Sequence, residues 1–220
     1  MRNAVRHAAL AAALVVGLGT AAQANMITNG SFESGSPQPG VGSFATIGTG
    51  GTALSGWSVA AGNIDWINAF WQASDGTHSV DLNGNAPGTI SQSFATAVGS
   101  LYRLTFDLSG NPDGFDGIKQ VLVSAGDTSS TFDFDTTATS RSAMGWVGEQ
   151  LIFMATSALT TLTFESLSGG PNCCYGPAID NVVVELAGPG GAVDPVPAPA
   201  TLPLIAGAIA GLGWLRRRSA

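Results

Sequence analysis

Between residues 57 and 186 the chain alternates short apolar runs with clusters of Gly, Asn, Asp and Pro. In the run Tyr102–Leu108, apolar side chains occupy every second position, which places them on one face of a β-strand. No run keeps the 3.6-residue spacing of an amphipathic helix. The pattern predicts an all-β sandwich, with strands at residues 57–59, 64–67, 79–82, 89–94, 102–108, 119–124, 130–134, 149–156, 160–166 and 179–186.

The N-terminal residues have the pattern of an export signal. Arg2 and Arg6 precede an apolar run over residues 8–18, and Ala22-Gln23-Ala24 follows it. A basic start, a short apolar stretch and an A-x-A site are typical of a secretory signal peptide. The sequence therefore predicts a signal peptide over residues 1–24 and export through the inner membrane.

The C-terminal residues have the pattern of a membrane anchor. Residues 188–199 are rich in Gly and Pro and are expected to form an extended linker. Residues 202–215 are uncharged and would span about 21 Å as a helix, short of the ~30 Å hydrocarbon core. Arg216–Arg218 follow and favour the cytoplasmic side. We expect one anchoring helix within residues 200–218, with an ordinary tail anchor as the alternative to a sorting signal.

The order of these C-terminal elements resembles the PEP-CTERM sorting signal of exopolysaccharide-producing Gram-negative bacteria. Pro197 and Pro199 bracket an alanine where the family usually has glutamate, and the apolar run ends in Arg216, Arg217 and Arg218. The resemblance implies cleavage by a membrane-embedded exosortase, so that the helix anchors the protein only transiently. It also implies a location in the cell envelope, on the outer surface or in the extracellular matrix.

The body between residues 25 and 187 is strongly acidic. It contains three basic and fourteen acidic residues, which give a net charge of −11. Such a charge argues against nucleic acid or an anionic membrane surface as a partner. Its length suits one domain with a sizeable core.

Five motifs of the body resemble the choice-of-anchor C exported domain and its relatives of unknown function in plant cell walls. They lie in the same order at residues 29–33, 56–59, 62–67, 79–82 and 176–182. The resemblance implies a galactose-binding-like jelly roll, similar to several carbohydrate-binding modules. It further implies an extracellular polysaccharide as the partner.

The same resemblance implies a structural calcium ion that joins the first and last strands. The positions that match its ligands are Glu33 and Asp180, and carboxylates suit this hard cation. In the alternative reading, Glu33 accepts hydrogen bonds from backbone amides and Asp180 faces solvent. No other cofactor is expected.

No catalytic signature is present. The chain lacks G-x-S-x-G, H-E-x-x-H and Cys–His patterns, and His78 is expected to be a surface or strand-end residue. Asp65, Glu149 and Glu165 lie in apolar contexts, but no spacing selects a pair of them for glycoside hydrolysis. We therefore expect a binding protein. The alternatives are a self-associating matrix protein and, less favoured, a glycoside or ester hydrolase.

Loop residues supply the candidate ligand contacts. Trp71 and Tyr175 lie in loops rich in Gly, Ser and Asn and are expected to be exposed for stacking on sugars. Trp57 and Trp66 are expected in the core. The polar candidates from one further loop are Asn111, Asp113 and Asp116.

The chain has two cysteines, Cys173 and Cys174, and they are adjacent. Neighbouring Cα atoms are about 3.8 Å apart, which is closer than the ~4.4–6.8 Å of relaxed disulfides. Because exported cysteines are seldom reduced, a strained vicinal disulfide is favoured over free thiols. Intermolecular pairing is the third possibility.

Overall fold

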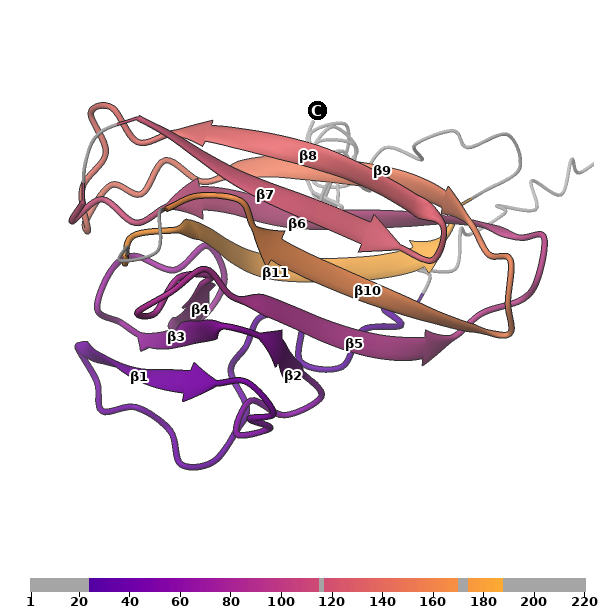
Figure 1. Cartoon of the computed structure of the whole chain (residues 1–220), viewed down its shortest axis with the longest axis horizontal. Helices are drawn as coiled ribbons and strands as arrows, with labels where there is room; N and C mark the ends of the chain where they lie inside the picture. Colours follow the sequence, from indigo (N-terminus) through magenta and orange to yellow (C-terminus); the bar gives the residue numbers. More distant parts are fainter. Residues whose placement is uncertain (1–23, 115–116, 170–173, 188–220) are drawn as a thin grey trace, which may run out of the picture.

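The computed structural model describes residues 24–114, 117–169 and 174–187. These residues form two antiparallel β-sheets, layered face to face with most strands running along the length of the molecule (Figure 1). One sheet has six strands in the order β1-β3-β4-β11-β6-β9, and the other has five in the order β2-β5-β10-β7-β8. The strands are β1 (Ser43–Gly48), β2 (Ser58–Ala61), β3 (Asn63–Asn68), β4 (His78–Asp81), β5 (Thr89–Ala95), β6 (Leu101–Gly110), β7 (Ile118–Ala125), β8 (Thr128–Asp135), β9 (Val147–Met154), β10 (Leu159–Ser166) and β11 (Pro177–Leu186).

The strand order is that of a jelly roll. From β4 onward the chain passes from one sheet to the other at every connection except the β7–β8 hairpin. The resulting orders, β4-β11-β6-β9 and β5-β10-β7-β8, place the last strand beside the first of the eight, as in the jelly-roll architecture. The predicted all-β jelly-roll sandwich is confirmed, and the described residues contain no helix.

The core lies between the two sheets and follows the period-two pattern. On β6, Tyr102, Leu104, Phe106 and Leu108 are at most 2% exposed. Trp57 and Trp66, expected in the core, are also buried. Their indole N–H groups donate to the carbonyls of Asn29 and Phe32, so each ring is buried without leaving its polar atom unsatisfied.

All ten strands expected from the sequence are present, and their ends differ from the expected ones by at most two residues. β1 was not expected. It pairs with β3 at the edge of the six-stranded sheet, and Ile47 is its one buried residue. An edge strand with so few buried positions does not need the apolar alternation by which strands are recognised in a sequence.

The outer face of the six-stranded sheet is partly covered by residues 69–77 and 137–146. Trp71 and Met144 from these segments pack on Ile67 and Ala178 of the sheet, forming a second buried cluster. Trp71 is 3% exposed, so its predicted exposure is wrong. Its indole N–H donates to the Ser79 hydroxyl at 2.8 Å, which satisfies the polar end of the ring.

The first described residues are attached to the last strand. The Asn25 side chain donates to the Val182 carbonyl and accepts from the Val184 amide. The Met26 amide donates to the Val184 carbonyl. The first described residues and the last strand of the domain therefore lie side by side.

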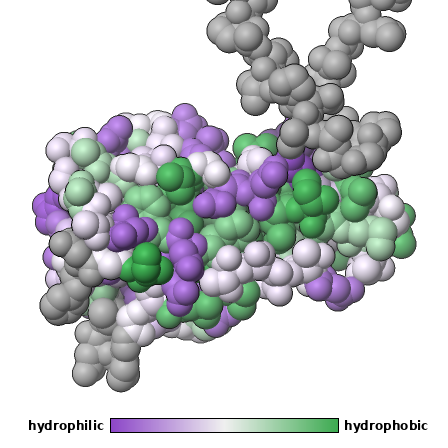
Figure 2. Space-filling view, turned by 90° about the horizontal axis from the view of Figure 1, so that it is seen from above, coloured by the Kyte–Doolittle hydropathy of each residue, from purple (hydrophilic) through white to green (hydrophobic). Residues whose placement is uncertain are grey.

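Hydrophobic residues are interrupted by hydrophilic ones on the face seen from above (Figure 2). Among the described residues, Phe44 on β1 is the one aromatic side chain with a large exposed fraction, 44%. No helix long and apolar enough to cross a membrane occurs in the described ranges. The predicted signal peptide up to residue 23, the linker from residue 188, the anchor helix and the sorting residues all lie outside them.

Candidate functional site

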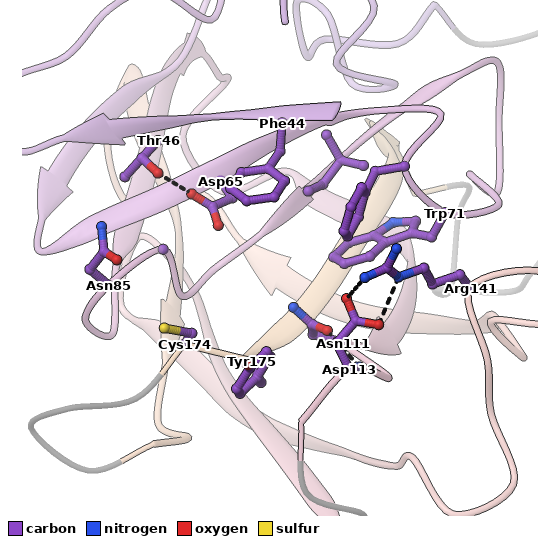
Figure 3. Close-up of a pocket in the computed structure, with 13 residues that line it drawn as sticks. Phe44, Thr46, Asp65, Trp71, Asn85, Asn111, Asp113, Arg141, Cys174 and Tyr175 are labelled. Carbon is purple, nitrogen blue, oxygen red and sulfur yellow. Dashed lines mark hydrogen bonds and ion pairs between the residues drawn. The ribbon is translucent and has the colours of Figure 1, made fainter. Parts of the chain in front are cut away.

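A pocket of about 510 Å³ opens on the outer face of the six-stranded sheet (Figure 3). Strands β1 and β3 form one side of it, and loops after β3, β4 and β6 and before β9 and β11 form the rest. Its volume falls in the range of small-molecule sites. The lining residues are Phe44, Thr46, Asp65, Ile67, Phe70, Trp71, Gly84, Asn85, Asn111, Asp113, Arg141, Cys174 and Tyr175.

Aromatic rings are concentrated on one part of the wall. Phe44 and Phe70 meet edge to face with their centroids 5.2 Å apart, and Phe70 also contacts Trp71 at 6.0 Å. The guanidinium of Arg141 lies over the Phe70 ring, 3.9 Å from its centroid. These contacts hold the rings in fixed positions, because each packs against a neighbour that is itself anchored.

Arg141 and Asp113 form a two-pronged ion pair. Nε and Nη2 of Arg141 donate to the two carboxylate oxygens of Asp113, each at 2.7 Å (Figure 3). The hydrogen bonds to Asp113 raise the pKa of Arg141. A guanidinium carries five N–H groups, so three of them remain available to other acceptors.

Asp65 contributes a carboxylate on the opposite side of the pocket, as Figure 3 shows. It projects from β3 and accepts a hydrogen bond from the Thr46 hydroxyl of β1 at 2.6 Å. Burial raises the pKa of Asp65, and the bond from Thr46 partly offsets this effect. The pocket therefore has an acceptor on one side and donors on the other.

Asp81 ties together the strand ends beneath the pocket. It is completely buried at the end of β4. Its carboxylate accepts from the amides of Asn83 (2.9 Å) and Gly176 (3.0 Å) and from Nδ2 of Asn111 (2.7 Å). Desolvation raises the pKa of Asp81 to about 7 against the opposing effect of these bonds, and the charge of Asp65 adds to the rise.

Tyr175 is held in an uncommon backbone conformation. Its φ angle is +79°, in the left-handed region that is a steric outlier for a bulky side chain. A Cβ on Gly114 would lie 2.5 Å from Cγ of Tyr175, so the close approach of the ring requires glycine there. This close packing fixes the position of the Tyr175 ring on the pocket wall.

Four of the five predicted ligand contacts, Trp71, Tyr175, Asn111 and Asp113, line this one pocket. Trp71 contributes to its wall although the side chain is buried. The fifth, Asp116, lies outside the described residues.

The lining residues that sequence reasoning missed include Phe44, Thr46, Asn85 and Arg141. Phe44 and Thr46 belong to the unexpected strand β1. Asn85 and Arg141 lie in loops with no local pattern to single them out. The one available signal was that Arg141 is one of only three basic residues in the body.

Glu33, one of the two predicted calcium ligands, is occupied by hydrogen bonds. Oε1 accepts from the amides of Thr77 and His78, both at 2.7 Å, and Oε2 contacts the Thr77 hydroxyl and Nδ1 of His78. Desolvation acts to raise the pKa of Glu33, but these bonds outweigh it and the net shift is downward. His78 is the first residue of β4, which confirms the strand-end position, and at 5% exposed it does not lie on the surface.

Asp180 is completely buried, and the alternative in which it faces solvent is wrong. Its Oδ2 accepts from the amides of Ser74 (2.8 Å) and Asp75 (2.9 Å), and its Oδ1 accepts from the amide of Asn181 (2.7 Å). Burial raises the pKa of Asp180 to about 7.

The residues do not form a calcium site as they are arranged. N–H and O–H donors occupy both lone pairs of each oxygen of Glu33, and a donor cannot share a lone pair with a cation. Nor do the described ranges contain a group of three or more His, Cys, Asp or Glu side chains that could hold a metal. Calcium stays an untested prediction, and the donor set of Glu33 does not fit it.

Cys174 lines the pocket and has no disulfide within the described residues. Its predicted partner, Cys173, lies outside them. The vicinal disulfide therefore stays a prediction.

The model of one protein family, described as "Protein of unknown function (DUF642)", matches residues 25–185. The chain belongs to the DUF642 family. This DUF642 protein is 33% identical over 177 residues to halomucin of Haloquadratum walsbyi, an alignment that covers 79% of the chain and 2% of halomucin. It is 29% identical to the DUF642 L-galactono-1,4-lactone-responsive protein of Arabidopsis thaliana, covering 74% of the chain and 46% of that protein.

Among solved structures, this DUF642 protein is similar to a family 61 carbohydrate-binding module in complex with β-1,4-galactotriose. The identity is 16%, the TM-score is 0.41, and the match covers 74% of this chain and 99% of the module. Of the two sequence relatives, halomucin and the Arabidopsis protein, the chain spans less than half the length of each.

Proposed function

We propose that this DUF642 domain binds extracellular polysaccharide in the pocket on its six-stranded sheet and catalyses no reaction. One observation carries the proposal. The pocket combines aromatic rings with polar groups that are already fixed by other contacts. A sugar ring offers an apolar face to an aromatic side chain and hydroxyl groups to donors and acceptors, which is the mixture found here.

The polar groups are arranged before any ligand arrives. The ion pair fixes Arg141, the Thr46 hydroxyl orients Asp65, and Asn111 is held by Asp81. Groups ordered in advance lose little conformational entropy on binding, and this favours affinity for a flexible oligosaccharide.

The carboxylates support binding over hydrolysis. Asp65 and Asp81 are neighbours on β3 and β4, but Asp81 is sealed from the pocket with its oxygens bonded to three N–H groups. Asp113 is paired with Arg141. Asp65 is thus the one carboxylate among the described lining residues without a cationic partner, and glycoside hydrolysis uses two.

The proposal includes export and delivery by the terminal signals. Its support is the order of the sequence elements, with a signal peptide first and Pro197, Pro199 and Arg216–Arg218 last. The choice-of-anchor C relationship belongs to the same proposal. The intact mass of the protein recovered from cells tests the proposed export and the processing at both ends of the chain. We expect losses that correspond to cleavage after Ala24 and near Pro199, and an unprocessed chain would refute it.

Affinity retention of the purified full chain on a panel of insoluble and immobilised polysaccharides tests the binding function. We expect retention on at least one, reduced more than tenfold by Phe44→Ala because the stacking ring is lost. Leu159→Ala is the matched control, since Leu159 is 60% exposed on β10 of the other sheet. Retention that is equal in the wild type and Phe44→Ala, or absent for every polysaccharide, would refute binding at this pocket.

A further inference from the structure

The charge of the pocket bears on which polysaccharides it can take. Three charged side chains line it among the described residues: Asp65, Asp113 and Arg141. Arg141 and Asp113 neutralise each other through a two-pronged ion pair. This leaves Asp65 as the uncompensated charge, so the pocket is negative.

Asp65 is well placed to act on a ligand. It accepts a hydrogen bond from a neutral group, the Thr46 hydroxyl, at 2.6 Å, and no cation neutralises it among the pocket-lining residues described. The side chain is half-buried, so water screens it less than an exposed carboxylate. In Figure 3 it projects toward the space enclosed by Phe44, Asn85 and Tyr175.

We propose that the pocket takes uncharged glycans and excludes uronate-containing ones, with Asp65 as the excluding charge. The inference rests on the proposed polysaccharide-binding function and names the ligand class for that site. A neutral sugar hydroxyl can donate to the Asp65 carboxylate, whereas a uronate carboxylate repels it. The remaining N–H groups of Arg141 can donate to either kind of glycan, and Asp113 cancels the charge of Arg141, so Arg141 does not offset the repulsion.

The expected discrimination follows from Coulomb's law. Two unit negative charges about 6 Å apart, at an effective dielectric constant of about 20, change a binding constant by roughly a hundredfold. Counter-ions reduce this, so we expect roughly tenfold to hundredfold selectivity at low salt and a smaller factor at high salt.

The test compares each polymer with its carboxyl-reduced form, which differs only in having CH₂OH in place of the carboxylate at C6. Suitable pairs are polygalacturonate, β-1,4-glucuronan and mannuronan with their reduced derivatives, measured by affinity retention and calorimetry on the full chain at pH 8. We expect the reduced member of at least one pair to bind at least tenfold more tightly. Asp65→Asn should narrow that gap several-fold because it removes the negative charge. The amide oxygen can still accept from Thr46, so the local structure is kept.

Asp133→Asn is the matched control. Asp133 is exposed on β8 of the other sheet, so this variant makes the same change in net charge outside the pocket. We expect it to leave the gap unchanged, which separates the local charge from the net charge of the domain.

The outcomes separate the inference from the function on which it rests. Uronate polymers bound as tightly as their reduced forms, or more tightly, would overturn the inference and leave polysaccharide binding standing. A gap that Asp65→Asn narrows no more than Asp133→Asn does would also overturn it. Failure of both members of every pair to bind would overturn the proposed function and the inference together.

Discussion

The buried carboxyl group of Asp81 makes a quantitative prediction about stability. Burial raises its pKa from 3.8 to about 7, so the folded state favours the protonated form. The contribution of this group to stability is therefore fully present below about pH 4 and is lost as the pH rises toward 7. Three pKa units correspond to about 4 kcal/mol.

The substitution Asp81→Asn removes this titration at the expense of one hydrogen bond. The new amide can still accept from the Asn83 and Gly176 amides, but it places an NH₂ group against Nδ2 of Asn111, which now donates to Oδ2. Loss of that acceptor costs about 1–3 kcal/mol. At pH 4, close to the unfolded-state pKa of 3.8, we expect the variant to be less stable by about that amount. At pH 8 the order reverses, and the variant is more stable by about 1–3 kcal/mol.

Urea unfolding followed by tryptophan fluorescence at pH 4, 5, 6, 7 and 8 measures this crossing. Asp133→Asn, an exposed carboxylate on β8, serves as the control and should give a curve parallel to that of the wild type. The quantity that decides is the difference in unfolding free energy between Asp81→Asn and the wild type. If this difference changes by less than about 0.5 kcal/mol over the whole pH range, the argument is refuted. Asp81 would then not titrate between pH 4 and 8.

Three further predictions concern the pocket and the calcium question. Trp71→Ala should lower the free energy of unfolding by about 3–5 kcal/mol, because the ring is buried; a loss below about 1 kcal/mol in urea unfolding would contradict its place in the second cluster. Tyr175→Gly should relieve the left-handed strain and keep the melting temperature within a few degrees while weakening glycan retention; unaltered retention would remove the ring from the site. Chelation with EGTA should leave the melting temperature unchanged, because hydrogen-bond donors already occupy the Glu33 carboxylate. A fall of several degrees would show that calcium is bound, since a bound ion must stabilise the native state.

The sheets could be predicted because their information is local. The alternation in β6 and its counterparts states which face is buried within each strand. Two positions show the limit of that approach. Trp71 lies in a loop of polar composition, yet Met144 covers it from a segment about seventy residues away. β1 carries so little apolar alternation that it is recognised only by its pairing with β3.

The pocket was only partly predictable for the same reason. Tyr175, Asn111 and Asp113 could be chosen as loop residues with suitable chemistry. Arg141 becomes a site residue through tertiary contacts, with Phe70 and with Asp113, which lies 28 positions earlier in the chain. The selectivity inferred for Asp65 also depends on the ion pair between Arg141 and Asp113, because this pair decides whether the pocket keeps an uncompensated positive charge.

The attachment of Asn25 and Met26 to β11 has a consequence for how the domain can be used. Met26 bonds to Val184, three residues before Ala187, a separation of about 10 Å along a strand. A unit whose entry and exit points are this close can be inserted into a larger polypeptide with almost no gap to bridge. The alignment with 2% of halomucin shows that a sequence of this kind does occur as a small part of a very long protein.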